Sequence, residues 1–125
     1  MRPDVEIFVR MKILMVCLGN ICRSPLAEGV LRHLAAARGL DWEIDSAGTG
    51  NWHVGHSPDH RAIKEARRNG VDISGLRGRQ FQTADFDAFD RIYVMDRNNY
   101  RDVLRLARNQ DHKQKVHFLL PEQQD

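Results

Sequence analysis

The fold is decided by residues 12–25, which read Lys12-Ile13-Leu14-Met15-Val16-Cys17-Leu18-Gly19-Asn20-Ile21-Cys22-Arg23-Ser24-Pro25. The apolar run at 12–16 is typical of a strand that is covered on both faces of a parallel sheet. Small and polar residues then predict a loop. Ser24 is a natural N-cap and Pro25 suits the first position of a helix. The stretch therefore predicts a strand, a loop and a helix, with Cys17 at the end of the strand.

The same alternation continues along the chain. Apolar residues at helical spacing predict that the first helix ends at Gly39. Further strands are predicted at 42–46, 92–95 and 116–120, and further helices at 57–70 and 98–108. This order indicates an α/β fold, a four-stranded parallel sheet flanked by helices. Ligands of such sheets bind beyond the carboxyl ends of the strands, which is where Cys17 lies.

Length and composition place limits on the function. The chain has 125 residues, 29% charged and 42% hydrophobic, which fits one globular domain. The net charge of +2 is too small to indicate a nucleic acid or a membrane surface as a partner. Both cysteines lie in the short loop, which indicates reactive thiols in a reducing compartment, and hence a cytoplasmic protein.

Charged residues elsewhere are interpreted as surface. Asp85, Asp87 and Asp90 are predicted to be solvated positions and caps around a short helix, with Phe86 and Phe89 facing inward. A solvated helix face is also predicted from four basic residues at near-helical spacing, Arg97, Arg101, Arg105 and Arg108.

The loop carries the parts that bind a phosphate dianion. Its small residues let backbone N–H groups turn toward an anion, and the helix that follows adds its positive N-terminal end. Arg23 offers a rigid fork for two phosphate oxygens. In that positive field Cys17 is expected to be a thiolate and a nucleophile. The plainer interpretation of Cys17 is a small core residue at the end of a strand.

At this point the sequence resembles the low-molecular-weight protein tyrosine phosphatase family. The family signature, Cys-x-Gly-Asn-x-Cys-Arg-Ser, is matched at every fixed position. The resemblance continues through residues 45–49, Trp52 and residues 93–96, and covers about residues 11 to 120. It implies a phosphatase domain at 11–125, preceded by an extension at 1–10 to which no role is assigned.

The resemblance also implies a reaction. Cys17 would attack phosphorus to give a phosphocysteine, which water then hydrolyses, while Arg23 holds the equatorial oxygens. The expected substrate is a phosphotyrosine-containing protein or a small aryl phosphate, with no cofactor and no metal. The phosphate-binding loop would consist of Leu18, Gly19, Asn20, Ile21, Cys22 and Ser24.

Individual roles follow from the same resemblance. Asn20 and Ser24 would support the loop by hydrogen bonding, and Cys22 would protect Cys17 through a reversible disulfide. For Cys22 the alternative is loop packing. Trp52 would form the pocket wall that stacks on the phosphotyrosine ring, the alternative being burial in the core. Ile21 favours aryl phosphates, since the arginine-phosphatase branch carries threonine there.

Three histidines lie close together in the sequence, as metal ligands often do. The histidines at 53, 56 and 60 would share one face only on a continuous helix, and Gly55 and Pro58 interrupt it. We therefore predict no metal ligand among them.

The sequence departs from the family pattern in two places. It contains no Asp-Pro pair, which supplies the family's general acid, and it lacks the expected C-terminal helix. The domain is thus predicted to be incomplete at its C-terminal end, with slower turnover, an exposed apolar sheet surface and self-association. Leu76 stands where many relatives place a histidine that contacts the loop network, and Ser74 or Arg77 would have to substitute.

Two other functions remain open at this point. An arsenate reductase on the same fold would need a resolving cysteine, for which only Cys22 is available. A catalytically impaired binder of phosphate or phosphotyrosine would retain affinity without turnover.

Overall fold

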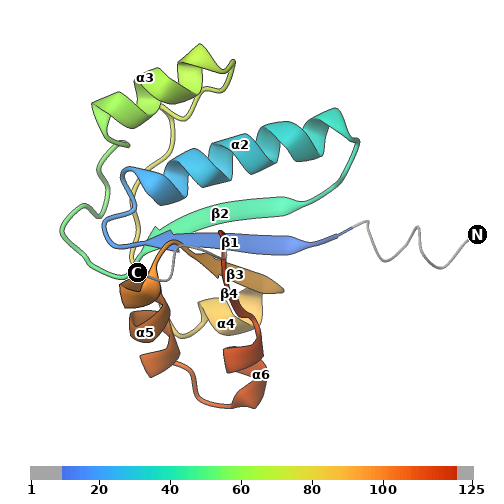
Figure 1. The fold of residues 1–125 in the computed structure, drawn as a ribbon, viewed down its shortest axis with the longest axis vertical. Helices are drawn as coiled ribbons and strands as arrows, with labels where there is room; N and C mark the ends of the chain where they lie inside the picture. The colour runs from blue at the N-terminus through green and yellow to red at the C-terminus, as the bar shows by residue number, and fades with distance from the viewer. Residues whose placement is uncertain (1–9, 121–125) are drawn as a thin grey trace, which may run out of the picture.

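The computed structural model describes residues 10–120 and has the predicted α/β architecture (Figure 1). Four parallel strands form one sheet in the order β2-β1-β3-β4. Their bounds are Lys12–Cys17 for β1, Glu43–Gly48 for β2, Arg91–Val94 for β3 and Val116–Phe118 for β4. The predicted sheet is confirmed. The extension predicted at 1–10 lies outside the described residues except for Arg10.

Strand β1 lies inside the sheet and is buried on both faces. Ile13, Met15 and Cys17 point to one face, in a cluster with residues of helix α2 (Arg23–Ala37). Leu14 and Val16 point to the other face, into the larger core cluster. This alternation places the Cys17 side chain on the face that α2 covers.

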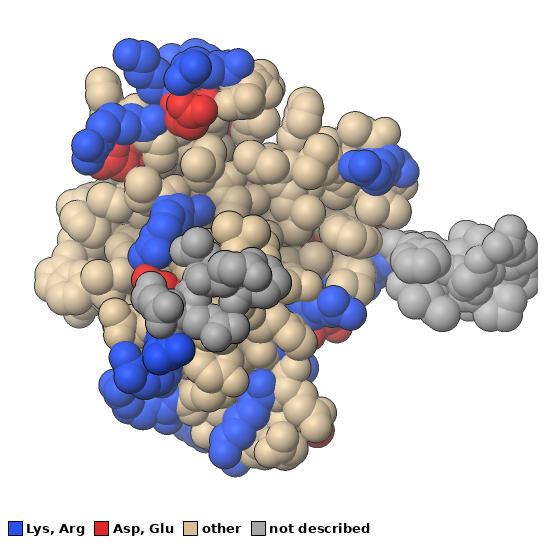
Figure 2. All heavy atoms as spheres, viewed as in Figure 1, with Lys and Arg blue, Asp and Glu red and all other residues tan. Residues whose placement is uncertain are grey.

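The helices lie on both faces of the sheet (Figure 1). Helices α2 and α3 (His60–Arg68) are on one side and contact each other. On the other side lie α4 (Asp85–Ala88), α5 (Arg97–Arg105) and α6 (Gln110–Gln114). Basic side chains gather over α3 and over α5 (Figure 2), and the four arginines predicted on a solvated face, at 97, 101, 105 and 108, are all exposed.

The N-cap predicted at Ser24 is wrong. Helix α2 begins at Arg23 with Cys22 in the cap position, and Cys22 makes no side-chain cap hydrogen bond. Ser24 is instead fully buried, because its hydroxyl bonds to groups of the loop below the helix. The second helix starts later than predicted, at His60, since Asp59 caps it by accepting from the Arg61 N–H.

The predicted solvated position of Asp85 is also wrong, while the inward direction of its neighbours is confirmed. Phe86 and Phe89 are buried in the core cluster. Asp85 is 8% exposed, because both of its carboxylate oxygens accept from Arg79.

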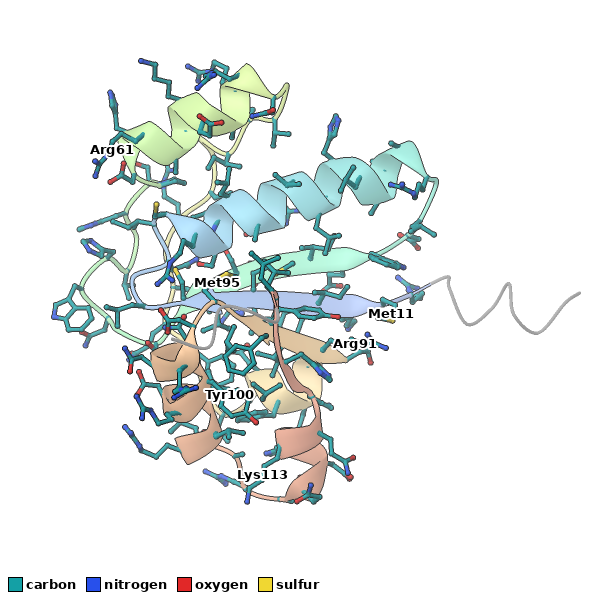
Figure 3. All side chains as sticks on the ribbon, viewed as in Figure 1. Met11, Arg61, Arg91, Met95, Tyr100 and Lys113 are labelled. Carbon is teal, nitrogen blue, oxygen red and sulfur yellow. The ribbon has the colours of Figure 1, made fainter. Side chains whose placement is uncertain are left out.

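One part of the sheet face beside α2 remains open. Two apolar cavities of about 450 and 350 Å³ share Ala27, Val30 and Leu119 and together form one groove. The groove extends from Met11 to Met95, both labelled in Figure 3. The exposed apolar sheet surface expected from the sequence is therefore present. Among residues 10–120 no helix is long and apolar enough to span a membrane.

Candidate active site

The candidate nucleophile lies at the carboxyl end of a central strand. Cys17 is the last residue of β1 and pairs in register with Gly48, the last residue of β2. The loop 18–22 leaves the strand here and leads directly into α2. Two loop contacts brace this end of the sheet, since the N–H groups of Thr49 and Gly50 donate to the carbonyls of Cys17 and Leu18.

Asn20 holds the shape of the loop. It is 3% exposed, and its backbone φ is 56°, in the left-handed region that residues other than glycine rarely adopt. Its Nδ2 donates to the hydroxyls of Ser24 at 2.8 Å and Ser46 at 2.9 Å. Its Oδ1 accepts from the backbone N–H of Arg79 at 2.9 Å. These three hydrogen bonds offset the cost of the backbone conformation.

The same bonds determine the direction of each hydroxyl proton. Because the Arg79 N–H can only donate, it must face Oδ1 of Asn20, and Nδ2 must face the two serines. The Ser24 oxygen thus accepts from Asn20, and its own proton is available to Cys17 Sγ, 3.0 Å away. The N–H of Asn20 donates to the same sulfur at 3.3 Å. Two donors are thus aimed at the Cys17 sulfur.

The second branch of this network ends at a buried carboxyl. Ser46 accepts from Asn20 and donates to Oε1 of Glu28 at 2.6 Å. Arg32 lies 2.7 Å from Oε2 of Glu28 as an ion pair without hydrogen-bond alignment, because its Nη2 donates to the Ile44 carbonyl. Burial raises the pKa of Glu28, although the Ser46 hydrogen bond and Arg32 oppose that effect.

Arg79 connects the loop to the rest of the sheet. Its guanidinium makes a bidentate pair with Asp85, at 3.1 Å for each bond, and donates to Asp45 at 3.1 Å. Burial disfavours the charged guanidinium, but the carboxylates of Asp85 and Asp45 outweigh burial and raise the pKa of Arg79. This clamp fixes the backbone N–H that orients Asn20.

Many relatives carry a histidine where this chain has Leu76, and we expected Ser74 or Arg77 to take its place in the loop network. Neither side chain does so. Ser74 bonds to Asp72, and Arg77 donates to the carbonyls of Ser74 and Leu76. The contact from this segment to Asn20 comes from the Arg79 backbone instead. Leu76 packs against a small apolar cluster between α2 and α3.

Arg23 is paired with an acidic residue at the end of β3. Its Nη1 lies 3.0 Å from Oδ2 of Asp96, and the Arg23 side chain is 48% exposed. The other oxygen of Asp96 accepts from the Asn99 N–H at 2.9 Å and caps α5. Asp96 therefore joins the arginine of the loop to the start of a helix on the opposite face.

The remaining predicted residues lie around this centre. Trp52 is 65% exposed, so the alternative of core burial is wrong. Its ring lies over Gly50, where an added Cβ would come within 2.0 Å of it. Cys22 is exposed and Cys17 is buried, both as free thiols. Ile21 is partly buried in the loop.

The predicted histidines do not form a metal centre in the described part of the chain. His53 and His56 contact each other, Nδ1 to Nδ1 at 3.3 Å, whereas His60 begins α3. Residues 10–120 contain no group of three or more His, Cys, Asp or Glu side chains placed to bind a metal ion. The ring of His53 instead packs against Gly19 of the loop.

Sequence reasoning gave no role in the network to Glu28, Ser46, Arg79, Asp85 and Asp96. Asp96 had a usable signal, because it directly follows the carboxyl end of a predicted strand. Arg79 had none, since it contacts Asn20 through a backbone group that every residue except proline carries.

Comparisons with known proteins agree on one family. Residues 12–122 match the family model described as low molecular weight phosphotyrosine protein phosphatase. A protein of that name from Schizosaccharomyces pombe is 46% identical over 98 residues, which cover 76% of this chain and 62% of that protein. This chain thus spans less than two thirds of that relative's length.

Solved structures show the same similarity. A protein tyrosine phosphatase from Entamoeba histolytica, with Hepes in its active site, is 34% identical and superimposes with a TM-score of 0.84. That match covers 91% of this chain and 77% of the other. YfkJ from Bacillus subtilis is 39% identical, with a TM-score of 0.84 over 93% of this chain and 75% of YfkJ.

Proposed function

This chain belongs to the low molecular weight phosphotyrosine protein phosphatase family, and on that premise we propose that it hydrolyses aryl phosphate monoesters, phosphotyrosine in proteins above all. The observation that carries the proposal is the sulfur of Cys17, which lies at the end of β1 with two donors aimed at it, the Ser24 hydroxyl and the Asn20 N–H.

The first step is attack of the Cys17 thiolate on phosphorus. The sulfur–phosphorus bond forms as the bond to the phenolic oxygen breaks, and the phenol departs with a proton from water. Ser24 and Asn20 donate hydrogen bonds to the sulfur before attack. In the second step water attacks the phosphocysteine, which releases inorganic phosphate and restores the thiolate.

Arg23 would hold the phosphate oxygens during both steps. To do so it must exchange the Asp96 carboxylate for two phosphate oxygens, a bidentate partner of higher charge. The Arg23 side chain is 48% exposed, so solvent and ligand can reach the guanidinium. Charge developing on the phosphoryl oxygens is then stabilised by the guanidinium and by the loop amides.

The phosphate-binding loop of the proposal consists of residues 18–22 with Ser24. Trp52 supports the preference for an aromatic substrate, because its exposed indole is free to stack on a phenyl ring. Ile21 adds an apolar side chain at the same loop, which favours an aryl ester.

Cys22 is proposed to protect the nucleophile. Oxidation of Cys17 by a peroxide, which is reduced to water or an alcohol, would give a sulfenic acid, and attack of the Cys22 thiol would release water and give a disulfide that a cellular thiol can reduce. Both thiols are free and Cys22 is exposed, which supports this step and a reducing, cytoplasmic location.

The proposal is tested with 4-nitrophenyl phosphate and unsubstituted phenyl phosphate at mildly acidic pH. The native chain should hydrolyse the first, and Cys17→Ser should abolish turnover. Because the 125 residues include no Asp-Pro pair, we expect phenyl phosphate, with its poorer leaving group, to react slower by ~10²–10⁴-fold. Cys22→Ser changes the other cysteine of the loop and should keep more turnover than Cys17→Ser, because its thiol does not attack phosphorus.

Turnover that survives Cys17→Ser would contradict the mechanism. If the native chain binds inorganic phosphate but hydrolyses neither ester, its function is phosphate binding rather than catalysis.

A further inference from the structure

Six of the seven exposed large apolar side chains of the described residues fall into two regions, and the seventh, Val54, lies in neither. Val30, Leu34 and Leu120 lie along the open groove beside α2. Leu18, Trp52 and Leu106 lie elsewhere, exposed by 48%, 65% and 43%, and all three line a single cavity. Exposed apolar side chains that meet around one cavity indicate a binding surface.

This cavity, here called the α5 pocket, has a volume of about 360 Å³. Its lining comes from the loop after β1, the segment after β2, the segment before α4, and α5 with its C-cap: Leu18, Thr49, Gly50, Trp52, Gln80, Phe81, Asp102, Arg105 and Leu106. The size is that of a site for one or two side chains rather than for a folded partner.

The α5 pocket is continuous with the candidate active site. Leu18 directly follows Cys17, and its carbonyl accepts from the Gly50 N–H. Trp52, which we propose as the wall of the aryl site, lines the pocket as well. A group bound in the pocket would therefore lie next to the residue whose phosphate Cys17 attacks.

The pocket lining contains one acidic and one basic side chain, Asp102 and Arg105, and α5 carries two more exposed arginines, Arg97 and Arg101. The Arg105 side chain is 73% exposed, and its contact with Asp102 is long, 3.4 Å, within one turn of helix. Such exposed pairs contribute little and exchange readily. Basic side chains gather over this helix in Figure 2, so the surface around the pocket complements an acidic ligand.

We propose that the α5 pocket binds an apolar side chain of a phosphotyrosine peptide, with a neighbouring carboxylate paired to Arg105. The inference rests on the proposed function, because it places the phosphotyrosine at Cys17. An extended peptide advances 3.3–3.6 Å per residue, so residues one or two positions from the phosphotyrosine would reach a pocket that adjoins the loop.

The occupant is a peptide rather than a small aryl phosphate for a physical reason. A small aryl phosphate satisfies the loop and Trp52 and leaves the pocket empty. Only a ligand that continues past the phenyl ring can bury Leu106 and reach Arg105 in the same complex.

Three phosphotyrosine (pTyr) peptides test the inference. The first is Ala-Leu-Glu-pTyr-Glu-Leu-Ala, which offers both groups on either side. The second replaces both leucines with serine, and the third replaces both glutamates with glutamine. The native chain should show the highest kcat/KM for the first peptide, about tenfold above the second, as expected for filling an apolar pocket.

Matched variants assign the effect to the pocket. Leu106→Ala should remove the preference for leucine over serine, whereas Leu34→Ala should keep it, although both leucines are 43% exposed. Arg105→Gln should remove a two- to fivefold preference for glutamate over glutamine, the range of an exposed ion pair. Arg108→Gln removes the same charge near α5 without touching the pocket and should keep that preference.

For each variant, kcat/KM for a peptide is divided by kcat/KM for 4-nitrophenyl phosphate before the peptides are compared. If the native chain hydrolyses that ester but treats the three peptides alike, the pocket is overturned and the proposed function stands. Equal loss of preference in Leu106→Ala and Leu34→Ala also overturns it.

If the native chain hydrolyses no ester, the proposed function fails. Calorimetric measurement of the binding of the three peptides to Cys17→Ser then tests whether the α5 pocket binds a peptide side chain. Tighter binding of the first peptide supports the pocket, and equal binding of all three peptides overturns it.

Discussion

At the scale of single residues, one amide group organises the site. Asn20 uses both hydrogens and the oxygen of its side chain to join the loop to α2, β2 and the segment before α4. The geometry of the nucleophile therefore depends on groups that never touch substrate. A substitution should alter this geometry most where the added atoms would collide with the loop.

Gly48 is such a position. A Cβ added there would lie 2.7 Å from the Leu18 carbonyl oxygen and 3.1 Å from Asn20, both parts of the loop. We expect Gly48→Ala to displace the loop and to lower kcat/KM for 4-nitrophenyl phosphate by about 10²-fold, the scale of a 1 Å misplacement. Gly75→Ala is the control, because an added Cβ meets nothing within 4 Å. Equal activity of the two variants would refute this account.

Glu28 supplies a prediction about pH. Its pKa is raised by burial, so the native chain keeps a proton there at pH values where the unfolded chain has lost it. The stability contributed by the neutral acid is fully present below about pH 4.5, the ordinary pKa, and is lost as the pH rises through the raised pKa.

We therefore expect Glu28→Gln to gain in Tm relative to the native chain as the pH rises from about 5 to 7. Glutamine can still accept from Ser46, so the trend reports the charge rather than the hydrogen bond. Thermal unfolding measured across this range gives the Tm difference. Glu65→Gln, on the exposed pair with Arg68, corrects for loss of a surface carboxylate. A Tm difference that shrinks with pH would contradict the prediction.

The motif at 17–24 predicted which residues form the loop around the proposed nucleophile, because loop chemistry needs fixed residue types at fixed spacing. The family resemblance implied that Ser24 supports the loop by hydrogen bonding, whereas the local pattern of Ser24 and Pro25 predicted a helix cap, and the cap is wrong. A serine before a proline carries the same local signal in both roles, and only the position of Asn20 across the loop separates them.

At the scale of elements, Asp96 connects helix α5 to helix α2. One carboxylate oxygen caps α5, and the other pairs with Arg23, the first residue of α2. The start of a helix on one face of the sheet is thus tied to the loop arginine from the other face.

We expect Asp96→Ala to lower the free energy of unfolding by about 1 kcal/mol through loss of the cap. Asp96→Asn should retain most of that stability, because asparagine caps helices as well as aspartate does. Urea unfolding of the two variants measures the difference. Asn109→Ala, which removes the corresponding cap of α6, should cost a similar amount. A loss of stability as large in Asp96→Asn as in Asp96→Ala would show that the ion pair, rather than the cap, matters.

Strand β1 was predictable because its apolar run is strong, whereas the segment that forms β2 gives only a weak strand signal. Helix α6 was missed, since its five residues, Gln110–Gln114, hold no apolar side chain. Its stability comes from the Asn109 cap and from His112, which stacks on Phe86 with ring centroids 4.5 Å apart. Contacts of that kind depend on chain segments distant in sequence.

At the scale of the whole molecule, the two sheet faces differ. The face toward α5 is packed with apolar side chains, while the face toward α2 keeps the groove between Met11 and Met95 open. We propose that copies of this chain associate through that groove, because an apolar surface of this kind gains free energy when covered.

Sedimentation velocity at rising protein concentration should show association of the native chain. Leu34→Glu should shift the equilibrium toward monomer, because it places a charge in the groove. Leu106→Glu alters an equally exposed leucine outside the groove and should leave the association unchanged. Association that persists in Leu34→Glu would exclude the groove as the interface.

The parallel order of the sheet also has a consequence in time. Strand β1 is made first but pairs with β3, where Ile13 meets Arg91, and the Lys12 N–H donates to Asp90, 78 positions later. Contacts between such distant segments form slowly. During synthesis on the ribosome, Cys17 therefore emerges long before Asp96 and the rest of its surroundings. The growing chain therefore passes through a period in which the sulfur of Cys17, the proposed nucleophile, lacks the strands that later bury it.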